Sequence, residues 1–250
     1  MTLQGKIALV AGGGRGIGAA TAQLLAARGA CVVVNYLQNS ATASQVIAKI
    51  HENGGQALAV QADIRDQHQA ESLVQEARDA YGRIDILVNS ASPSGVIKPF
   101  EQMNWDEFAL GVNRELKAAF VLTKAVLPTM QQQHYGRIIY IASGLAKAPS
   151  MDGAISIGTA KAGLVAFAKY IAKEYGPSGI TANVVSPQMV ETDLSARIPA
   201  EQRQRLAAMT PLGRIAQPED IAHVIAFFAS DDSGFMTGTY APVNGGLTMD

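Results

Sequence analysis

The sequence predicts a single α/β domain built on a doubly wound parallel sheet of about seven strands. Short runs rich in β-branched residues alternate with helical segments along the whole chain, as they do when each strand is followed by a crossover helix. Most of these runs are apolar at successive positions, which is typical of strands that are covered on both faces. The chain has 250 residues, 48% of them hydrophobic, and is therefore long enough to form one large core.

The predicted strands are evenly distributed along the chain. They are residues 6–12, 31–36, 57–63, 84–91, 137–143, 180–186 and 240–246. Helices are predicted between them, and the longest cover about 104–133 and 156–175. Asp66 is placed to cap one helix, and Pro218 lies in the first turn of another. Residues 188–216 contain no predicted strand, and we interpret them as a substrate lid within the single domain 1–250.

Composition excludes several classes of partner. The formal net charge is −1, so the chain offers no basic surface for nucleic acid or for an anionic membrane. No run of about 20 apolar residues is long enough to span a bilayer. The single cysteine, Cys31, has no partner for an internal disulfide, which favours a cytoplasmic protein. Small molecules are therefore the expected partners.

A glycine-rich turn, AGGGRGIG at residues 11–18, follows the first strand and opens the first helix. Glycines there allow the backbone to approach a pyrophosphate, and the helix N-terminus favours its negative charge. A tight turn between strand and helix also requires glycine, so the glycines indicate nucleotide binding only together with the strand before them and the helix after them.

The residues after the second strand indicate which dinucleotide is bound. A carboxylate about 20 residues beyond the glycines is the usual partner of the NAD ribose, but this chain has Asn35 and Tyr36 there. Arg15 lies in the glycine turn, and Asn39 and Ser40 follow the strand. A cation without a competing carboxylate predicts NADP(H), whose 2′-phosphate it can bind.

Several motifs together resemble the short-chain dehydrogenase/reductase family, in particular its β-ketoacyl-acyl carrier protein reductase type. They are the glycine spacing, Asp63 after the third strand, NSAS at 89–92, Asn113, Ser143, Lys161, and SPQMVETDL with Pro187 and Thr192. The resemblance extends over essentially the whole chain. It implies a Rossmann-like fold, a nicotinamide cofactor and a homotetramer.

The resemblance also implies roles for individual residues. The phosphates would be held by Gly12, Arg15, Gly16, Ile17 and Gly18, the adenine by Asp63 and Ile64, the adenosine-side ribose region by Asn89, the nicotinamide ribose by Lys161, and the carboxamide by Thr192, beside Pro187. Asn113, Ser143 and Lys161 would be three members of the family's catalytic tetrad of Asn, Ser, Tyr and Lys.

The tyrosine of that tetrad is absent. In the family it stands four residues before the lysine, on the same helix face, where the ammonium favours ionisation of the phenol. This chain has Ile157 at that position, and isoleucine has no proton to donate. Ser156, Asp152 and Ala154 are not expected to replace it. Ser92 and Gln188 also stand where the family has glycine, so the departures gather near the reaction centre.

Three functions are compatible with this pattern. The first is an NADPH-dependent oxidoreductase that acts on a carbonyl, or on a conjugated enone or thioester, with a non-standard proton donor. A positioned general acid contributes about 10²- to 10⁴-fold to rate, so a slow reductase can operate without one. The second is a catalytically silent, cofactor-binding subunit that pairs with an active homologue. The third is a non-redox isomerase or cyclase.

Overall fold

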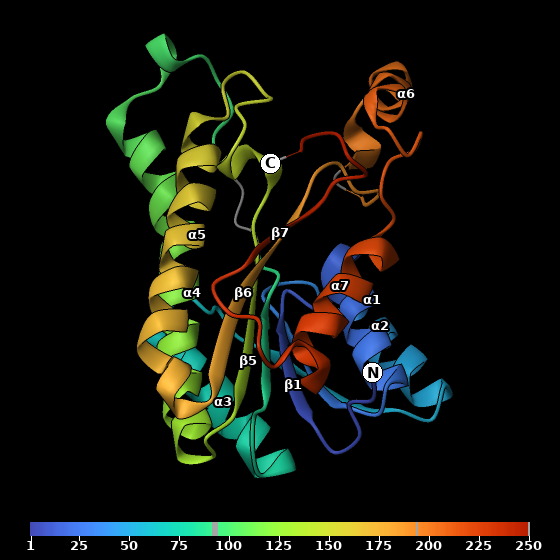
Figure 1. Ribbon diagram of the computed structural model, residues 1–250, viewed down its shortest axis with the longest axis vertical. Coiled ribbons are helices and arrows are strands. Elements are labelled where there is room, and N and C mark those ends of the chain that lie inside the picture. The colour runs from blue at the N-terminus through green and yellow to red at the C-terminus, as the bar shows by residue number, and fades with distance from the viewer. Residues whose placement is uncertain (92–94, 194, 250) are drawn as a thin grey trace.

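Seven parallel strands form one sheet in the order β3-β2-β1-β4-β5-β6-β7 (Figure 1). The strands are β1 (Ile7–Ala11), β2 (Cys31–Tyr36), β3 (Gln56–Gln61), β4 (Ile86–Asn89), β5 (Gly136–Ile141), β6 (Ile180–Pro187) and β7 (Tyr240–Val243). The structure is a computed structural model, and it describes residues 1–91, 95–193 and 195–249. Each predicted strand is present, within a few residues at either end, so the predicted fold class is confirmed.

Helices cover both faces of the sheet (Figure 1). On one face lie α3 (Gln67–Tyr81), α4 (Trp105–Gln132) and α5 (Ile155–Tyr175), and on the other α1 (Gly16–Ala27), α2 (Ser40–Glu52) and α7 (Pro218–Ala229). The buried apolar residues accordingly form two clusters, one under each helical layer. Burial on both faces explains why the strands are apolar at successive positions.

Local signals in the sequence account for several helix ends. The Asp66 Oδ1 accepts a hydrogen bond from the Gln69 N–H at 3.0 Å and caps α3. Asn104 and Glu107 form a reciprocal capping box at the start of α4. Short 3₁₀ helices cover Phe100–Gln102, Gly144–Ala146, Gly176–Ser178, Ser195–Arg197 and Asp231–Ser233.

One helix lies outside the two layers. α6 (Ala200–Met209) stands above the carboxyl edge of the sheet (Figure 1), inside the region 188–216 that we interpreted as a lid without a strand. None of its residues is buried, and such a helix has no clear apolar stripe to reveal it in the sequence.

α5 and the 3₁₀ turn after it, Ile155–Ser178, are long and apolar enough to meet a length and hydropathy criterion for a membrane span. Core helices of layered proteins meet the same criterion. Here α5 packs against α4 and β6, and its Leu164 and Ala168 belong to the core cluster on that face.

Candidate functional site

The candidate site lies at the carboxyl edge of the sheet, where β1, β4, β5 and β6 end. The strand order reverses between β1 and β4, and ligands of open α/β sheets bind at such a switch point. The glycine turn follows β1, Asn89 ends β4, Ser143 follows β5, and Pro187 ends β6. The fold therefore gathers residues that are far apart in the sequence.

The glycine turn is closely packed and leaves its backbone accessible to a ligand. Gly12 has a φ of +69°, and a Cβ there would lie 2.9 Å from the Ala91 backbone. A Cβ on Gly18 would overlap the Gly12 carbonyl oxygen, and one on Gly16 would lie 3.2 Å from the Thr192 Cγ2. Only glycine fits these positions, and the fold brings Thr192 beside the turn.

Asn89 carries a polar atom that lacks a partner. The residue is 5% exposed, and its Oδ1 has no hydrogen-bond partner among the described residues. A buried acceptor without a donor is costly, so a ligand hydroxyl or N–H at this point would stabilise the site. This orphaned oxygen, together with the glycine turn, fits a bound dinucleotide.

Arg15 follows Gly14, which lies against the start of α2. It is exposed and precedes α1 without making a side-chain cap. The next glycine back, Gly14, lies against the first turn of α2, because a Cβ there would be 3.4 Å from the Thr42 Oγ1. Asn39 caps that turn by accepting from the Thr42 N–H at 3.1 Å, and Ser40 is exposed. Thr42 is a neighbour of this region that the sequence analysis missed.

Asn35 is hydrogen-bonded within the edge of the sheet. Its side chain is 2% exposed, and its Nδ2 donates to the Val60 carbonyl at 3.3 Å and the Ala62 carbonyl at 3.0 Å. The amide thus joins the end of β2 to the end of β3. Its Nδ2 is therefore occupied within the sheet, and the cofactor contact of Asn35 stays a prediction.

The adenine-side residues are partly occupied by local contacts. The Asp63 carboxylate accepts from the Arg65 Nε at 2.8 Å and Nη2 at 2.7 Å, and this hydrogen bonding keeps the pKa of Asp63 below its usual value. Ile64 is buried in the core, so only its backbone is available to a base. Ile17 is half-buried against the opposite core cluster.

Ser143 and Lys161 are brought to the same region. The Lys161 Nζ donates to the Ile141 carbonyl at 2.9 Å, two residues before Ser143. Ser143 is half-buried, and its Oγ accepts from the Leu145 N–H at 3.3 Å. A Cβ on Gly158 would lie 3.2 Å from the Leu145 carbonyl, so the start of α5 packs on the turn that follows Ser143.

Ile157 stands one helical turn before Lys161 on α5, at the position where the resemblance implies a tyrosine. It is half-buried and lies against Gly95, where a Cβ would be 2.6 Å from the Ile157 Cγ1. Ser156 does not replace the phenol, because it is buried and donates to the Val96 carbonyl at 3.2 Å. Asp152 is exposed before the helix, and Ala154 precedes its first residue.

The partner of Lys161 on α4 is Glu115, and Asn113 does not reach it. The Lys161 Nζ donates to the Glu115 Oε1 at 2.8 Å, and the two side chains are 5% and 7% exposed. Asn113 is exposed, since two residues along a helix correspond to about 200° of rotation. Glu115 shares the buried stripe of α4 with Gly111, Ala118 and Leu122, so helical periodicity was the signal that could have revealed it.

Tyr140 is a core residue. It is fully buried, its hydroxyl lies 2.7 Å from the Thr123 Oγ1, and its ring packs edge-on against Phe167. Burial raises its pKa. It therefore has no place at the reaction centre.

Gln188 extends across the turn after β5. A Cβ on Gly144 would overlap the Gln188 Oε1, which has no hydrogen-bond partner among the described residues. The Gln188 Nε2 donates to the Ser150 Oγ at 3.2 Å. Gln188 thus covers the residue next to Ser143. Ser92, the other departure from family glycine, lies outside the described residues.

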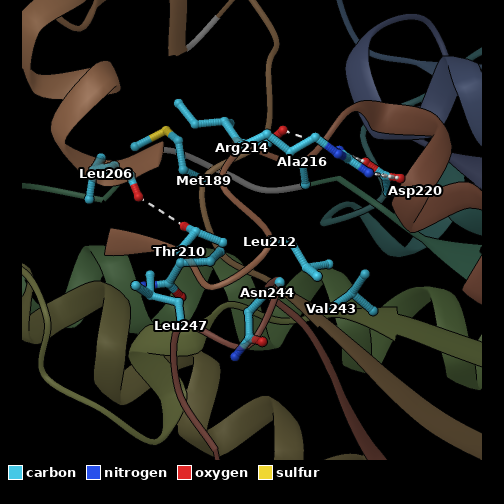
Figure 2. A pocket seen from close by; sticks show the side chains of 13 residues that line it. Met189, Leu206, Thr210, Leu212, Arg214, Ala216, Asp220, Val243, Asn244 and Leu247 are labelled. Carbon is cyan, nitrogen blue, oxygen red and sulfur yellow. Dashed lines mark hydrogen bonds and ion pairs between the residues drawn. The ribbon is translucent and has the colours of Figure 1, made fainter. Parts of the chain in front are cut away.

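A cavity of about 210 Å³ lies between the lid and the C-terminal segment. Figure 2 shows Met189 and Leu206 on the lid side, Asn244 and Leu247 on the other, and Arg214 bonded to Asp220 at one end. Among the apolar residues of the lid, Met189 and Leu206 line the cavity, Ile198 is half-buried, Met209 is exposed, and Leu194 lies outside the described residues.

The fold and this arrangement define a Rossmann-like member of the short-chain dehydrogenase/reductase class. The sequence model of the family described as Enoyl-(Acyl carrier protein) reductase matches residues 11–248. The chain belongs to the short-chain dehydrogenase/reductase family of oxidoreductases, and within it is similar to the 3-oxoacyl-acyl-carrier-protein reductase type.

Individual relatives support this assignment. The chain is 39% identical to a 3-oxoacyl-acyl-carrier-protein reductase of Synechocystis, covering 99% of this chain and 98% of that protein. It is 36% identical to the Escherichia coli reductase FabG over the full length of both. Among solved structures, a variant of a Serratia marcescens short-chain dehydrogenase/reductase has a TM-score of 0.92 at 32% identity over the whole of both chains.

Proposed function

We propose that the protein is an NADPH-dependent oxidoreductase that acts on a carbonyl, or on a conjugated enone or thioester, and that obtains its proton without a tyrosine. The observation that carries this proposal is the cradle formed by Gly12, Gly16 and Gly18, together with the neighbouring Asn89 Oδ1, which has no hydrogen-bond partner among the described residues. It supports a bound dinucleotide. NADP(H), when bound, would supply or accept a hydride.

The residues proposed to hold the cofactor are those of the carboxyl edge. The glycine turn and Ile17 would face the pyrophosphate, and Arg15 with the Asn39–Thr42 turn would bind the 2′-phosphate. Asp63 and the Ile64 backbone would contact the adenine, and Asn89 the neighbouring ribose. Lys161 would bind the second ribose, while Thr192 and Pro187 would border the carboxamide.

The side chains beside the substrate set the chemistry. Ser143, at the N-cap of a 3₁₀ turn, has a hydroxyl that can donate to a carbonyl oxygen. Ile157 would present an apolar side chain to the substrate where the family has a phenol. Proton delivery from water is therefore part of the proposal, and substrates whose anionic product is stabilised by delocalisation, such as conjugated thioesters, suit it best. The lid of residues 188–216 is proposed to close over them.

An activity panel tests the proposal. NADPH oxidation is followed with β-ketoacyl thioesters, simple ketones, enones and enoyl thioesters, and matched reactions use NADH. We expect turnover with at least one class and a preference for NADPH of ten-fold or more. Turnover with none of them, by folded protein that binds NADPH, would reject the oxidoreductase.

A catalytically silent subunit is the second candidate. Among the relatives is a protein of Thauera aromatica, 35% identical to this chain, which is named as a subunit of a hydroxy(phenyl)methyl-succinyl-CoA dehydrogenase. A chain that retains the cofactor cradle but lacks the tyrosine suits a partner of an active homologue. Purification from the native source distinguishes the two, because a homo-oligomer, which we propose to be a tetramer, contains no second reductase. The non-redox isomerase or cyclase has no observation of its own in its favour.

A further inference from the structure

The ion pair between Lys161 and Glu115 is the feature of the reaction centre that neither the glycine cradle nor the lid explains. Both side chains are more than nine-tenths buried, and the Nζ to Oε1 distance is 2.8 Å. We propose that Glu115 is a positioning residue, which fixes the Lys161 ammonium and cancels its charge in a site that has no phenol to ionise.

The hydrogen bonds of the Lys161 ammonium fix the position of its Nζ. A lysine ammonium has three donors, and here one is used by the Glu115 Oε1 and another by the Ile141 carbonyl. The two acceptors belong to different elements, α4 and β5, so together they fix the Nζ between the helix and the end of the strand. Among the described residues the third N–H has no hydrogen-bond partner and is left for a ligand hydroxyl, and Glu115 thereby sets its direction.

The burial of the Lys161 ammonium explains why it needs a negative charge beside it. A buried ammonium without a counter-charge is strongly disfavoured, and Ile157, one helical turn away, supplies neither an anion nor a polar group. Glu115 supplies the negative charge instead. Two cations of the described residues near this part of the site have other contacts: Lys147, after the turn that follows β5, has its Nζ 4.4 Å from the centroid of the Tyr240 ring, and Lys98 is paired with Glu107.

The isoleucine and the glutamate are therefore two parts of one arrangement. A phenol placed at position 157 would face a neutral pair in place of a lone cation, and its ionisation would not be favoured. Restoring the tyrosine alone would then recover only part of a tyrosine-dependent site. Removing the charge of Glu115 as well would leave the ammonium to stabilise the phenolate.

The test compares Ile157→Tyr with the double variant Ile157→Tyr and Glu115→Gln, each against its Ile157 parent. Glutamine keeps the shape and the acceptor of Glu115 and removes the charge. The ultraviolet absorbance of tyrosinate is titrated with pH in the absence of any ligand. We expect the introduced phenol to titrate near or above the usual value of about 10 in the single variant, and about one pH unit or more lower in the double variant.

A matched control uses a second paired carboxylate on the same helix. Glu107 is bonded to Lys98 at the start of α4, so Ile157→Tyr combined with Glu107→Gln should titrate as the single variant does. Equal midpoints in the single variant and the Glu115 double variant would overturn the proposal.

A cysteine at position 157 is a smaller titratable side chain, and it tests the same proposal if a phenol does not fit against Gly95. Ile157→Cys is made with and without Glu115→Gln in a Cys31→Ser background, and the rate of thiol alkylation is measured against pH. The alkylation midpoint should fall by about one pH unit or more when the carboxylate charge is removed, and an unchanged midpoint would again reject the role of Glu115.

The importance of this pair for catalysis rests on the proposed function, but the titrations do not. They use neither cofactor nor substrate. Failure of the protein to bind NADPH would therefore reject the proposed function and leave the titration result standing. Turnover of NADPH with unchanged midpoints would reject only the role of Glu115.

Discussion

Gln188 lies directly over Gly144, in the place that a side chain at position 144 would occupy. The overlapping atom is the end of a long side chain, which can rotate away, so Gly144→Ala should displace Gln188 from the Ser150 hydroxyl rather than unfold the protein. We expect a loss of about 1 kcal/mol in the free energy of unfolding. In a Gln188→Ala background the same change should cost nothing measurable, and equal costs in both backgrounds would disprove the contact.

The buried pair of Lys161 and Glu115 makes a prediction about stability. Lys161→Met should lower the free energy of unfolding by about 3 to 5 kcal/mol, because it leaves a buried carboxylate without its partner. Adding Glu115→Leu should recover a large part of this loss in urea unfolding. For comparison, the more exposed Lys98–Glu107 pair should contribute much less, because solvent screens it. Additive losses at Lys161 and Glu115 would show that the two side chains do not interact.

Arg15 is predicted to select the cofactor. Arg15→Ala should weaken NADPH binding by about 10-fold or more, since a hydrogen bond to a charged group contributes about 1.5 to 3 kcal/mol. NADH binding should change little, because NADH has no 2′-phosphate. The two dissociation constants are measured by fluorescence titration at one fixed ionic strength. An equal loss for both cofactors would assign Arg15 to the pyrophosphate or to folding.

Asn35 should resist conversion to the acidic residue of NAD-dependent proteins. Asn35→Asp would replace an amide donor by a carboxylate that faces the Val60 and Ala62 carbonyl oxygens. We expect a loss of about 1 to 3 kcal/mol in the free energy of unfolding and no gain in NADH affinity. Tyr36→Asp, at the half-buried end of the same strand, is the matched variant, and a stable Asn35→Asp protein would contradict the role of Asn35.

The ion pair between Arg214 of the lid and Asp220 of α7 should make the stability of the protein depend on pH. Its hydrogen bonds from Arg214 lower its pKa from 3.8 to about 2, so the stabilisation is complete above pH 3.8 and is lost as the pH falls through about 2. Asp220→Asn should cost at most about 1 kcal/mol near pH 6, because the pair is partly exposed. The difference from the unmodified protein in urea unfolding should shrink below about pH 4. A difference that grows toward acid would exclude this ion pair as its source.

The sheet could be predicted from the sequence because most of its strands are apolar at successive positions, which indicates burial on both faces. β2 was placed at its observed bounds, since the apolar run from Cys31 to Tyr36 stands between helices with clear ends. α6 could not be placed, because an exposed helix has no apolar stripe. The glycine turn could also be predicted from the sequence, because the close packing of its backbone allows only glycine at these positions.

The interior of the site was less predictable, because it depends on which residues of different elements meet. Asn113 and Glu115 are both polar residues of α4, and only the rotation of the helix against α5 decides which one contacts Lys161. Asn35 was given a cofactor role from its place at the end of β2, whereas β3 alongside it supplies the carbonyls that bind its amide. Neither contact has a signature within a short stretch of sequence.

The strand order also has a consequence for how the protein folds. The Ile7 N–H donates to the Asp85 carboxylate, 78 residues away along the chain, and β1 lies between β2 and β4, so the switch point exists only after this long loop has closed. Parallel sheets with such distant pairings fold slowly, since the closure entropy is lost before the contacts are gained. The glycine turn and Asn89 come together only at that step. Binding competence should therefore appear late in refolding, and fragments that end before β4 should contain ordered helices without a nucleotide site.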